Sequence, residues 1–486
     1  MPSKVDFGQW IGNKNVPSLD SATIDVENPS EPGSVIGTVP AGCKADADAA
    51  LDAAKKAQPE WAKVPSAERA KVLKQIAQVV RDNREELIEL LYSEQAKEKG
   101  LATAEVDFTS IYLDYYAGLA HSYMGEIIQS DNRGENIYLH YAPIGVSVGI
   151  CPWNFPLFVW ARKVAPALLA GCTVVVKSSE VTPLTTFRLM EHVTKAIDAG
   201  KVDLPSGVIS VVTGYGNTIG AALVESPVPG IISMTGSVAT GQRIMAAAAK
   251  NMTKVSLELG GKAPVIVMDD ADIDKTVDAI VASRVIFSGQ VCNCAERLYI
   301  QSKVYDEVVD KLVAKMKSTK VGLPTDEGVA YCSQITKEHR EKISGMVERA
   351  VEAGAKVLCG GKFMDDGPGY CYEPTIIAGA AQDSEIMQKE VFGPVLPVAK
   401  FETFDEALAL ANDCEYGLTS SLYTNDYRLI ERARTELLFG ETYINRSHFE
   451  AIQGFHAGWR KSGVGGADGQ HGLMEYFNTK VIYVQQ

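Results

Sequence analysis

Short apolar runs that alternate with segments that fit helices constrain the fold of this chain more than any other feature. The apolar runs are 145–151, 173–177, 207–212, 230–235 and 254–259, and helices fit 157–170, 184–199, 217–225 and 238–250 between them. Strands that are apolar on both faces are typical of a parallel sheet covered by helices, with right-handed crossovers. The sequence therefore predicts a doubly wound α/β domain, the usual setting for a bound dinucleotide.

A second alternation begins at 263–270 and predicts another α/β domain. Helices fit 271–286, 304–318, 336–354 and 404–412, and strands fit 297–301, 356–359 and 395–400. Upstream, 5–45 is typical of short strands and turns, and helices fit 46–59 and 66–98. The strand-like segments 137–142 and 481–486 fit neither sheet. A chain of 486 residues exceeds what one core usually serves, so two or three domains are expected.

Charge and cysteine content exclude several classes of function. Acidic residues outnumber basic ones by 61 to 47, for a formal net charge of -14. An acidic surface repels phosphate backbones, so no nucleic-acid partner is expected. The nine cysteines lack the density and spacing of a secreted disulfide scaffold and favour a reducing, cytoplasmic compartment. The opening MPSKVDFGQW does not resemble a signal peptide.

The segment 141–161 carries no formal charge and is long enough to span a bilayer. Prolines and glycines interrupt it at 143, 145, 149, 152 and 156, where a single helix would break. The segment is therefore interpreted as a buried strand, a loop and the start of a helix, and no membrane partner is expected.

Cys292 is the first candidate for chemistry. It lies in FSGQVCNCAER, where Gly289, Gln290 and Asn293 indicate a loop. Taken alone, a cysteine is more often an inert buried side chain than a nucleophile. Cys294 completes a Cys-x-Cys pair, but no further Cys or His stands at zinc spacing, so no metal is expected.

Glu258 and Asn154 are candidates for which structural explanations stay open. Glu258 precedes Leu-Gly-Gly, and glycines let a backbone turn or a ligand approach. In a partly apolar site the pKa of its carboxyl would rise and it could act as a base, although an ordinary strand-end carboxylate is the alternative. Asn154, next to Trp153, could donate a hydrogen bond to an oxyanion or simply form a turn.

Two further segments could contact a nucleotide. Residues 236–241, GSVATG, lie between a strand and a helix, where a glycine-rich turn can hold a pyrophosphate. The spacing is neither GxGxxG nor a Walker motif, so a helix-capping turn is the alternative. Lys177-Ser-Ser-Glu180 follows a buried strand and could reach a ribose or form a solvated strand end.

In this order, the segments closely resemble the aldehyde dehydrogenase superfamily, along nearly the whole chain. The matching pieces are PWNFP (152–156), KSSE (177–180), MTGSVATG (234–241), LELGGK (257–262), GQVC (289–292), EVFGP (390–394), NDCEYGLTSS (412–421) and RKSGVGG (460–466). The resemblance implies a Rossmann-type cofactor domain, an α/β catalytic domain and a small β oligomerisation arm.

The resemblance also implies roles for individual residues. Cys292 would be the nucleophile, Glu258 would activate the hydrolytic water, and Asn154 with the backbone N–H of Cys292 would bind the oxyanion. The implied cofactor is NAD rather than NADP, because Glu180 resembles an adenine-ribose ligand that favours NAD. The expected cofactor-binding residues are Trp153, Lys177, Ser179, Glu180, Gly236, Ser237, Glu390 and Phe392.

Within the superfamily, several segments are similar to lactaldehyde and glycolaldehyde dehydrogenases. These segments are 125–139, 155–163, 288–297 and 440–472. The similarity implies that Arg162, Asn293, Glu450 and His456 hold a small hydroxyaldehyde, although an Arg162–Glu450 ion pair and a satisfied loop histidine are structural alternatives. Succinate semialdehyde as substrate, a CoA-acylating dehydrogenase and a non-catalytic binding relative are the alternative functions.

The resemblance implies domain boundaries and an assembly. The NAD-binding domain would comprise 1–123 and 144–258, the catalytic domain 259–440 with 441–470 returning past the active site, and the oligomerisation arm 124–143 and 471–486. A homodimer or homotetramer is expected, because an exposed strand edge is otherwise a liability. Three segments depart from the family's pattern: KSSE replaces KPSE, AYCSQ (330–334) is expected to lie far from the chemistry, and AKEKG (96–100) is expected to be peripheral.

Overall fold

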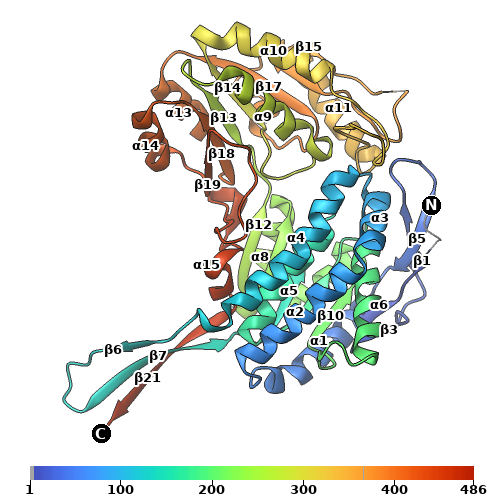
Figure 1. Ribbon diagram of the computed structural model, residues 1–486, viewed down its shortest axis with the longest axis vertical. Helices are drawn as coiled ribbons and strands as arrows, with labels where there is room; N and C mark the ends of the chain where they lie inside the picture. The colour runs from blue at the N-terminus through green and yellow to red at the C-terminus, as the bar shows by residue number, and fades with distance from the viewer. Residues whose placement is uncertain (1–4, 365) are drawn as a thin grey trace.

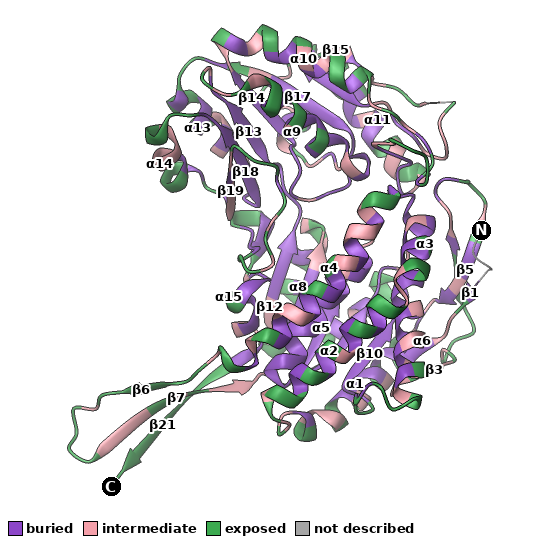
Figure 2. Ribbon diagram, viewed as in Figure 1, coloured by how far each residue is buried: buried purple, intermediate pink, exposed green. Residues whose placement is uncertain are grey.

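Two largely parallel sheets, each covered by helices, form the body of the protein, and a narrow β arm projects from it (Figure 1). The computed structural model describes residues 5–364 and 366–486. Buried residues concentrate in the two sheets and the helix faces against them, whereas the arm is exposed or half-buried along its length (Figure 2). This arrangement confirms the α/β fold that the two alternating patterns predict.

The first sheet has eight strands in the order β20-β12-β11-β8-β9-β10-β2-β3. Its five central strands are parallel, and antiparallel pairs complete both ends: β20 pairs with β12, and β2 lies between β10 and the edge strand β3. The bounds are β2 Gln9–Ile11, β3 Lys14–Val16, β8 Val146–Ile150, β9 Thr173–Lys177, β10 Ile209–Val212, β11 Pro229–Gly236, β12 Lys254–Leu259 and β20 Gly463–Val464.

Helices cover both faces of this sheet. One face packs on α1 Lys44–Trp61, α7 Ala221–Glu225 and α8 Val238–Ala248, and a π-helical turn at Gly216–Gly220 leads into α7. On the other face, α5 Pro156–Ala170 and α6 Leu184–Asp198 lie nearest the strands, and α2 Ser66–Asp82, α3 Arg84–Gln95 and α4 Lys99–Gly118 pack on these two helices. The five central strands are apolar in the sequence because both of their faces are buried.

The second sheet has seven strands in the order β15-β16-β17-β14-β13-β18-β19, with only β15 antiparallel. The strands are β13 Pro264–Val267, β14 Arg297–Gln301, β15 Lys356–Cys359, β16 Thr375–Ala378, β17 Val395–Phe401, β18 Thr419–Tyr423 and β19 Glu441–Ile444. The helices are α9 Ile273–Val285, α10 Tyr305–Lys317, α11 Lys337–Glu352, α12 Glu385–Gln388, α13 Phe404–Asn412 and α14 Tyr427–Glu436. Because β19 belongs to this sheet, the sheet continues past the expected boundary at 440.

Two small sheets complete the fold. The arm consists of β6 Glu126–Ile128, β7 Glu135–Pro143 and β21 Phe477–Gln485, and the C-terminus lies at its tip (Figure 1). The two strand-like segments without a place in either large sheet therefore pair with each other, with Leu139 opposite Val481. Near the N-terminus, β1 Val5–Asp6, β4 Thr23–Glu27 and β5 Val35–Pro40 form the other sheet, and α15 Gly469–Met474 precedes the arm.

The prediction of one continuous helix over 66–98 is wrong, because the structure has two helices there, α2 and α3. The chain breaks at Asn83, whose side-chain amide donates to the carbonyl of Val79 at 2.8 Å and so replaces a helical bond at the end of α2. A second break follows at Ala96, whose φ of 51° is left-handed. The sequence pattern predicted no element at α4, α14, β16, β18 or β19.

The uncharged segment 141–161 contains the end of β7, the whole of β8, a loop and the start of α5. This confirms its interpretation as a strand, a loop and a helix start. Among the helices of the described residues, none combines the length and the apolar character needed to cross a bilayer.

Candidate functional site

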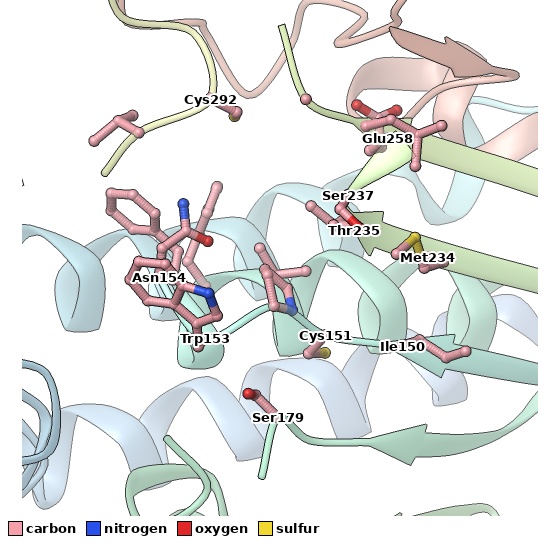
Figure 3. A pocket seen from close by; sticks show the side chains of 18 of the residues that line it. Ile150, Cys151, Trp153, Asn154, Ser179, Met234, Thr235, Ser237, Glu258 and Cys292 are labelled. Carbon is pink, nitrogen blue, oxygen red and sulfur yellow. The ribbon is translucent and has the colours of Figure 1, made fainter. Parts of the chain in front are cut away.

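A cavity of about 1370 Å³ lies where the carboxyl ends of β8, β9, β11 and β12 face loops of the seven-stranded sheet. Ligands of open α/β sheets bind at this end of the strands. The structure brings every site residue predicted from the sequence to the wall of this cavity. In Figure 3, Cys292 lies on a loop across the cavity from Trp153 and Asn154, and Glu258 projects from the end of a strand.

Cys292 is half-buried on the loop between a short 3-10 turn, Ile286–Gly289, and β14. Three successive residues before it, Phe287, Ser288 and Gly289, have left-handed φ values of 46°, 55° and 77°. Non-glycine residues adopt this region at a cost, and such strain persists only where neighbours hold it. Arg284 is one such neighbour, because its Nη2 donates to the carbonyl of Gly289 at 2.6 Å.

The AYCSQ segment, expected to lie far from the chemistry, instead supports this loop, so that expectation is wrong. The Ser288 hydroxyl donates to the carbonyl of Cys332 at 2.8 Å, and Gln334 Nε2 donates to the carbonyl of Ser288 at 3.1 Å. Val329 and Ala330 line the cavity itself. Tertiary contact, which the sequence spacing does not reveal, gives the segment this position.

Cys294 lies behind the loop and does not face the cavity. Its side chain is fully buried, and its thiol donates to the carbonyl of Val291 at 2.9 Å. Burial raises the pKa of this thiol to about 12, so it stays protonated at neutral pH. Among the described residues, no group of three or more His, Cys, Asp or Glu side chains could hold a metal ion.

Asn154 lies just before α5 and reaches the same loop. Its Nδ2 donates to the carbonyl of Gln290 at 3.0 Å, which leaves its second N–H for another acceptor. The backbone carbonyl of Asn154 accepts a hydrogen bond of 2.6 Å from the buried Lys97 ammonium. Lys97 also pairs with Glu105, which in turn accepts from the backbone N–H of Leu157 at the start of α5.

The AKEKG segment that contains Lys97 was expected to be peripheral, and the structure corrects this. The Lys97 ammonium lies 3.8 Å from the ring centre of Phe155 and 4.5 Å from that of Phe287, so it bridges the Asn154 and Cys292 loops. Its side chain is fully buried together with that of Glu105. The left-handed backbone at Ala96 allows this turn between α3 and α4.

Glu258, on β12, is a buried carboxylate with few polar groups around it to replace the water lost on burial. Within the described part of the chain, neither of its oxygens accepts a hydrogen bond, and its nearest ionic partner is His456 Nε2 at 3.3 Å. Burial raises the pKa of the Glu258 carboxyl, and the charges of His456, Arg162 and Lys163 oppose that rise. A carboxyl with a raised pKa beside a cavity suits proton transfer near neutral pH.

Arg162, on α5, is held by two carboxylates. Its Nε and Nη2 donate to Asp468 at 2.9 and 2.6 Å, and Nη2 also donates to Glu450 at 3.0 Å. The Tyr112 hydroxyl donates at 2.8 Å to Asp468 Oδ1, the oxygen that also accepts from Arg162 Nε. Sequence reasoning anticipated the Arg162–Glu450 ion pair as an alternative but missed Asp468, which stands in a glycine-rich segment with no distinguishing spacing.

Glu450 connects this ion pair to the cysteine loop. Its second oxygen accepts a hydrogen bond of 2.7 Å from Asn293 Nδ2, next to Cys292. Burial by itself would raise the pKa of Glu450, but His456 and Arg162 outweigh it and hold that pKa at about 2. The Asn293 Oδ1 is buried without a partner among the described residues, so the cavity wall keeps polar capacity beside the thiol.

His456 lies between two carboxylates. Its Nε2 faces Glu258, and its Nδ1 lies 2.7 Å from Glu441 Oε1. Burial alone would lower the pKa of the imidazole, but Glu258 and Glu441 raise it well above its usual value. The two flanking carboxylates therefore favour the imidazolium form of the ring.

The far end of the cavity carries donors suited to a dinucleotide. Lys177 Nζ pairs with Glu180 at 2.9 Å, and Ser179 lies beside them. Ser237 follows Gly236 and caps α8, accepting from the Thr240 N–H at 3.3 Å. A helix N-terminus reached through a glycine turn suits a pyrophosphate, so both alternatives for this segment, cap and phosphate site, are compatible.

Glu390, Phe392 and Trp153 lie between the two ends of the cavity. Phe392 has a left-handed φ of 59°, and its ring packs edge-on against Trp153 at 5.6 Å. Glu390 accepts a hydrogen bond of 2.9 Å from the Gly261 N–H, and burial raises its pKa to about 7. A Cβ at Gly260 would lie 2.4 Å from a Glu390 oxygen, so this glycine permits the approach of Glu390.

Comparison with known proteins finds relatives along the whole chain. The sequence profile described as "Aldehyde dehydrogenase family" matches residues 16–482. The chain is 50% identical over 486 residues to lactaldehyde dehydrogenase of Escherichia coli (strain K12), with 100% of both chains covered. It is 42% identical to 3,6-anhydro-alpha-L-galactose dehydrogenase of Vibrio sp. (strain EJY3), with 98% of both chains covered.

The fold has equally similar solved structures. The crystal structure of lactaldehyde dehydrogenase from Escherichia coli matches with a TM-score of 0.96 at 49% sequence identity, and 100% of each chain is covered. The resemblance noted in the sequence motifs therefore extends to the complete fold.

Proposed function

Because this chain belongs to the aldehyde dehydrogenase family, we propose that it oxidises small 2-hydroxyaldehydes, such as lactaldehyde and glycolaldehyde, with NAD as its preferred cofactor. The general activity, NAD(P)-dependent oxidation of a small aldehyde to an acid, is that of the family. The observation that carries the narrower proposal is the polar wall beside Cys292, formed by Asn293, Glu450, Arg162 and His456.

The first chemical step is assigned to Cys292. Its thiolate attacks the aldehyde carbon, a C–S bond forms, and the carbonyl electron pair moves to oxygen. The free N–H of Asn154 Nδ2 and the backbone N–H of Cys292 stabilise this oxyanion. One donor of this kind typically contributes about 100- to 1000-fold in kcat.

The residues at the far end of the cavity fit NAD(P). Thr235 Oγ1 is buried there without a partner among the described residues, and Lys177, Ser179, Gly236 and Ser237 line the same wall. Glu390, Phe392 and Trp153 would contact the nicotinamide half. Bound NAD(P) supplies the hydride acceptor that turns the tetrahedral adduct into a thioester on Cys292.

Hydrolysis of the thioester is assigned to Glu258. The carboxylate takes a proton from water, the water oxygen bonds to the acyl carbon, and the C–S bond breaks with its electron pair returning to sulfur. The proton then passes to the sulfur, and the product is the carboxylic acid. A hydrolytic base at this position disfavours the alternative of a CoA-acylating dehydrogenase.

The charge of the polar wall favours a neutral hydroxyl over an anionic substrate. Arg162 already has Asp468 and Glu450 as partners, so little of its charge is available to a substrate carboxylate. Glu450 stays ionised at neutral pH, because its pKa is held at about 2. This disfavours succinate semialdehyde. A non-catalytic binding relative would not need Cys292, Asn154 and Glu258 around one cavity.

The preference for NAD over NADP is proposed from Glu180. Its carboxylate lies 2.9 Å from Lys177 Nζ, on the wall where an adenine ribose would lie. A carboxylate suits a free 2′-hydroxyl and repels a 2′-phosphate.

The expected division of the chain becomes a proposal about roles. Residues 1–123 and 144–258 would bind NAD, 259–440 with 441–470 would complete the catalytic site, and 124–143 with 471–486 would form the oligomerisation arm. The arm exposes Ile127, Tyr138, Ile482 and Tyr483, which supports burial against another subunit in a homodimer or homotetramer. The nine free thiols support a cytoplasmic location.

Steady-state kinetics test this proposal. Formation of NADH from NAD, or of NADPH from NADP, is measured with lactaldehyde, glycolaldehyde, propionaldehyde and succinate semialdehyde. The hydroxyaldehydes with NAD are expected to have the highest kcat/KM, and loss of the hydroxyl should cost about 10- to 100-fold, because it leaves buried polar groups unpaired.

Two variants separate chemistry from recognition. Cys292→Ala should abolish NADH formation with every aldehyde, whereas Cys294→Ala, the matched control, should retain it. Glu450→Gln should lower kcat/KM for lactaldehyde more than for propionaldehyde. Undiminished turnover by Cys292→Ala would refute the mechanism, and an equal loss for both aldehydes in Glu450→Gln would refute the recognition of the hydroxyl.

A further inference from the structure

Glu441 is a half-buried carboxylate that no step above uses, although it contacts a residue of the site. It lies on β19, the edge strand of the seven-stranded sheet. Its Oε1 lies 2.7 Å from His456 Nδ1, and its Oε2 accepts a hydrogen bond from the Tyr443 hydroxyl. Both oxygens of Glu441 are therefore engaged, which fixes the carboxylate in one orientation.

His456 transmits this contact to the other sheet. Its Nε2 lies 3.3 Å from Glu258 Oε2 on β12, so a carboxylate–imidazole–carboxylate array crosses the cavity wall. The backbone of His456 exchanges two hydrogen bonds with Ala467, at 2.9 and 2.8 Å, which holds the loop in place. The ring cannot turn without breaking the contact with Glu441 or with Glu258.

The charges around His456 are mixed, and the two carboxylates in contact with the ring dominate. The Cys292 thiol also faces the ring, while Arg162, Lys163, Glu450 and Asp468 act on Glu258 or Glu450 nearby. Two anions on opposite ring nitrogens stabilise the doubly protonated imidazolium. The cation in turn favours the ionised form of Glu258, which has no hydrogen-bond donor among the described residues.

We propose that Glu441 is a positioning residue for thioester hydrolysis: it holds His456 as an oriented cation whose Nε2–H faces Glu258, and so keeps Glu258 ionised and ready to accept a proton from water. This inference rests on the proposed role of Glu258 as the hydrolytic base. His456 gains and loses no proton during the step, and the proton from water goes to Glu258 and then to the departing sulfur. The array therefore acts before the reaction, by setting the protonation state of the base.

The test measures hydrolysis directly. Wild-type and Glu441→Gln enzymes are mixed with NAD and lactaldehyde between pH 5.5 and 9, and the acyl-enzyme is followed by intact-protein mass spectrometry alongside NADH release. The glutamine amide keeps an acceptor oxygen for the His456 Nδ1–H but removes the negative charge. Glu436→Gln on α14 is the matched control, because it makes the same charge change at an exposed position.

In Glu441→Gln the acid limb of the hydrolysis rate is expected to move up by about one pH unit, which slows hydrolysis about tenfold below that limb. Acyl-enzyme should accumulate at pH 6, with an NADH burst, and largely disappear at pH 9. In Glu441→Asp and in the control Glu436→Gln, the hydrolysis rate should fall at the same acidic pH as in the wild-type enzyme. A Glu441→Gln limb that superimposes on wild type, or a loss that is equal at every pH, overturns the inference.

Glu258→Gln distinguishes the inference from its premise. It should accumulate acyl-enzyme at every pH, and if it hydrolyses the thioester normally, the role of Glu258 fails whatever Glu441 does. Should Glu441→Gln not fold, nitrogen NMR of histidine-labelled wild-type enzyme decides, since the chain has only seven histidines. The His456 ring is expected to carry protons on both nitrogens at pH 8, and a neutral ring there overturns the inference.

Discussion

Replacement of Lys97 by methionine tests the idea that a buried ion pair positions Asn154. In the native protein the Lys97 ammonium and the Glu105 carboxylate are completely buried against each other. Methionine keeps the apolar stem but removes the charge. Glu105 would then keep only the backbone N–H groups of Leu157 and Phe158, at 3.0 and 3.2 Å, as compensation.

The expected cost follows from these contacts. Removal of one partner of a buried ion pair typically costs about 3–5 kcal/mol. The lost charged hydrogen bond of 2.6 Å to the Asn154 backbone carbonyl is part of this cost. The two backbone N–H groups that still donate to Glu105 favour the lower half of this range. We therefore expect Lys97→Met to lower the free energy of unfolding by about 3–4 kcal/mol. Release of Asn154 should also reduce kcat by roughly 10- to 100-fold.

Urea unfolding followed by tryptophan fluorescence measures the stability change, at one fixed protein concentration because assembly is linked to folding. The matched control is Lys99→Met, an exposed lysine at the start of α4, which should stay within about 0.5 kcal/mol of wild type. The double variant Lys97→Met/Glu105→Gln should recover at least about 1 kcal/mol, since it removes the uncompensated charge. A Lys97→Met protein within about 1 kcal/mol of wild type and with unchanged kcat would refute the reasoning.

Three further predictions concern the loop before the nucleophile, a buried carboxyl and the arm. Gly289→Ala should prevent soluble folding, because the φ of Gly289 is 77° and a Cβ there would lie 2.3 Å from the Gly393 backbone. The control Gly328→Ala should fold, because Gly328 has a similar φ of 71° but a Cβ there would meet no atom within 4 Å. Equal soluble yields of the two variants would contradict the prediction. Burial raises the pKa of Glu98 from 4.5 to about 7, so its contribution to stability is complete below pH 4.5 and is lost as pH rises through 7, by up to about 3 kcal/mol. Glu98→Gln should flatten that decline in urea midpoints between pH 5 and 8, and parallel curves would count against it. Deletion of 477–486, which removes β21, should give a smaller assembly by light scattering, and an unchanged mass would exclude the arm as the subunit contact.

The elements that could be predicted from the sequence are those whose pattern is local. The apolar runs that became β8 to β12 are buried on both faces, so the continuous apolar pattern in the sequence matches the burial in the structure. Elements such as α4 and β18 escaped because polar side chains stand at several of their buried positions, so their burial does not show as an apolar pattern. These side chains include Glu105 and Thr109 in α4 and Ser420 in β18. The break at Asn83 escaped for a related reason, since its cap is a single side-chain hydrogen bond.

The candidate site divides in the same way. Cys292, Asn154 and Glu258 stand in short motifs, and the cavity wall contains all of them. No role was predicted for Asp468, Lys97 or Glu441, yet each forms an ion pair with or next to a site residue. Their importance depends on burial, because an ion pair that is weak at the surface becomes strong where water is excluded.

The sequence by itself determined the two α/β units and the order of the reactive side chains along the chain, because strand period and short motifs are local properties. Only the tertiary structure decided which charges meet: Arg162 with Asp468, His456 between Glu258 and Glu441, and the AYCSQ and AKEKG segments against the nucleophile loop. The physical reason is that electrostatic coupling depends on distance and burial in space, and separation along the chain specifies neither.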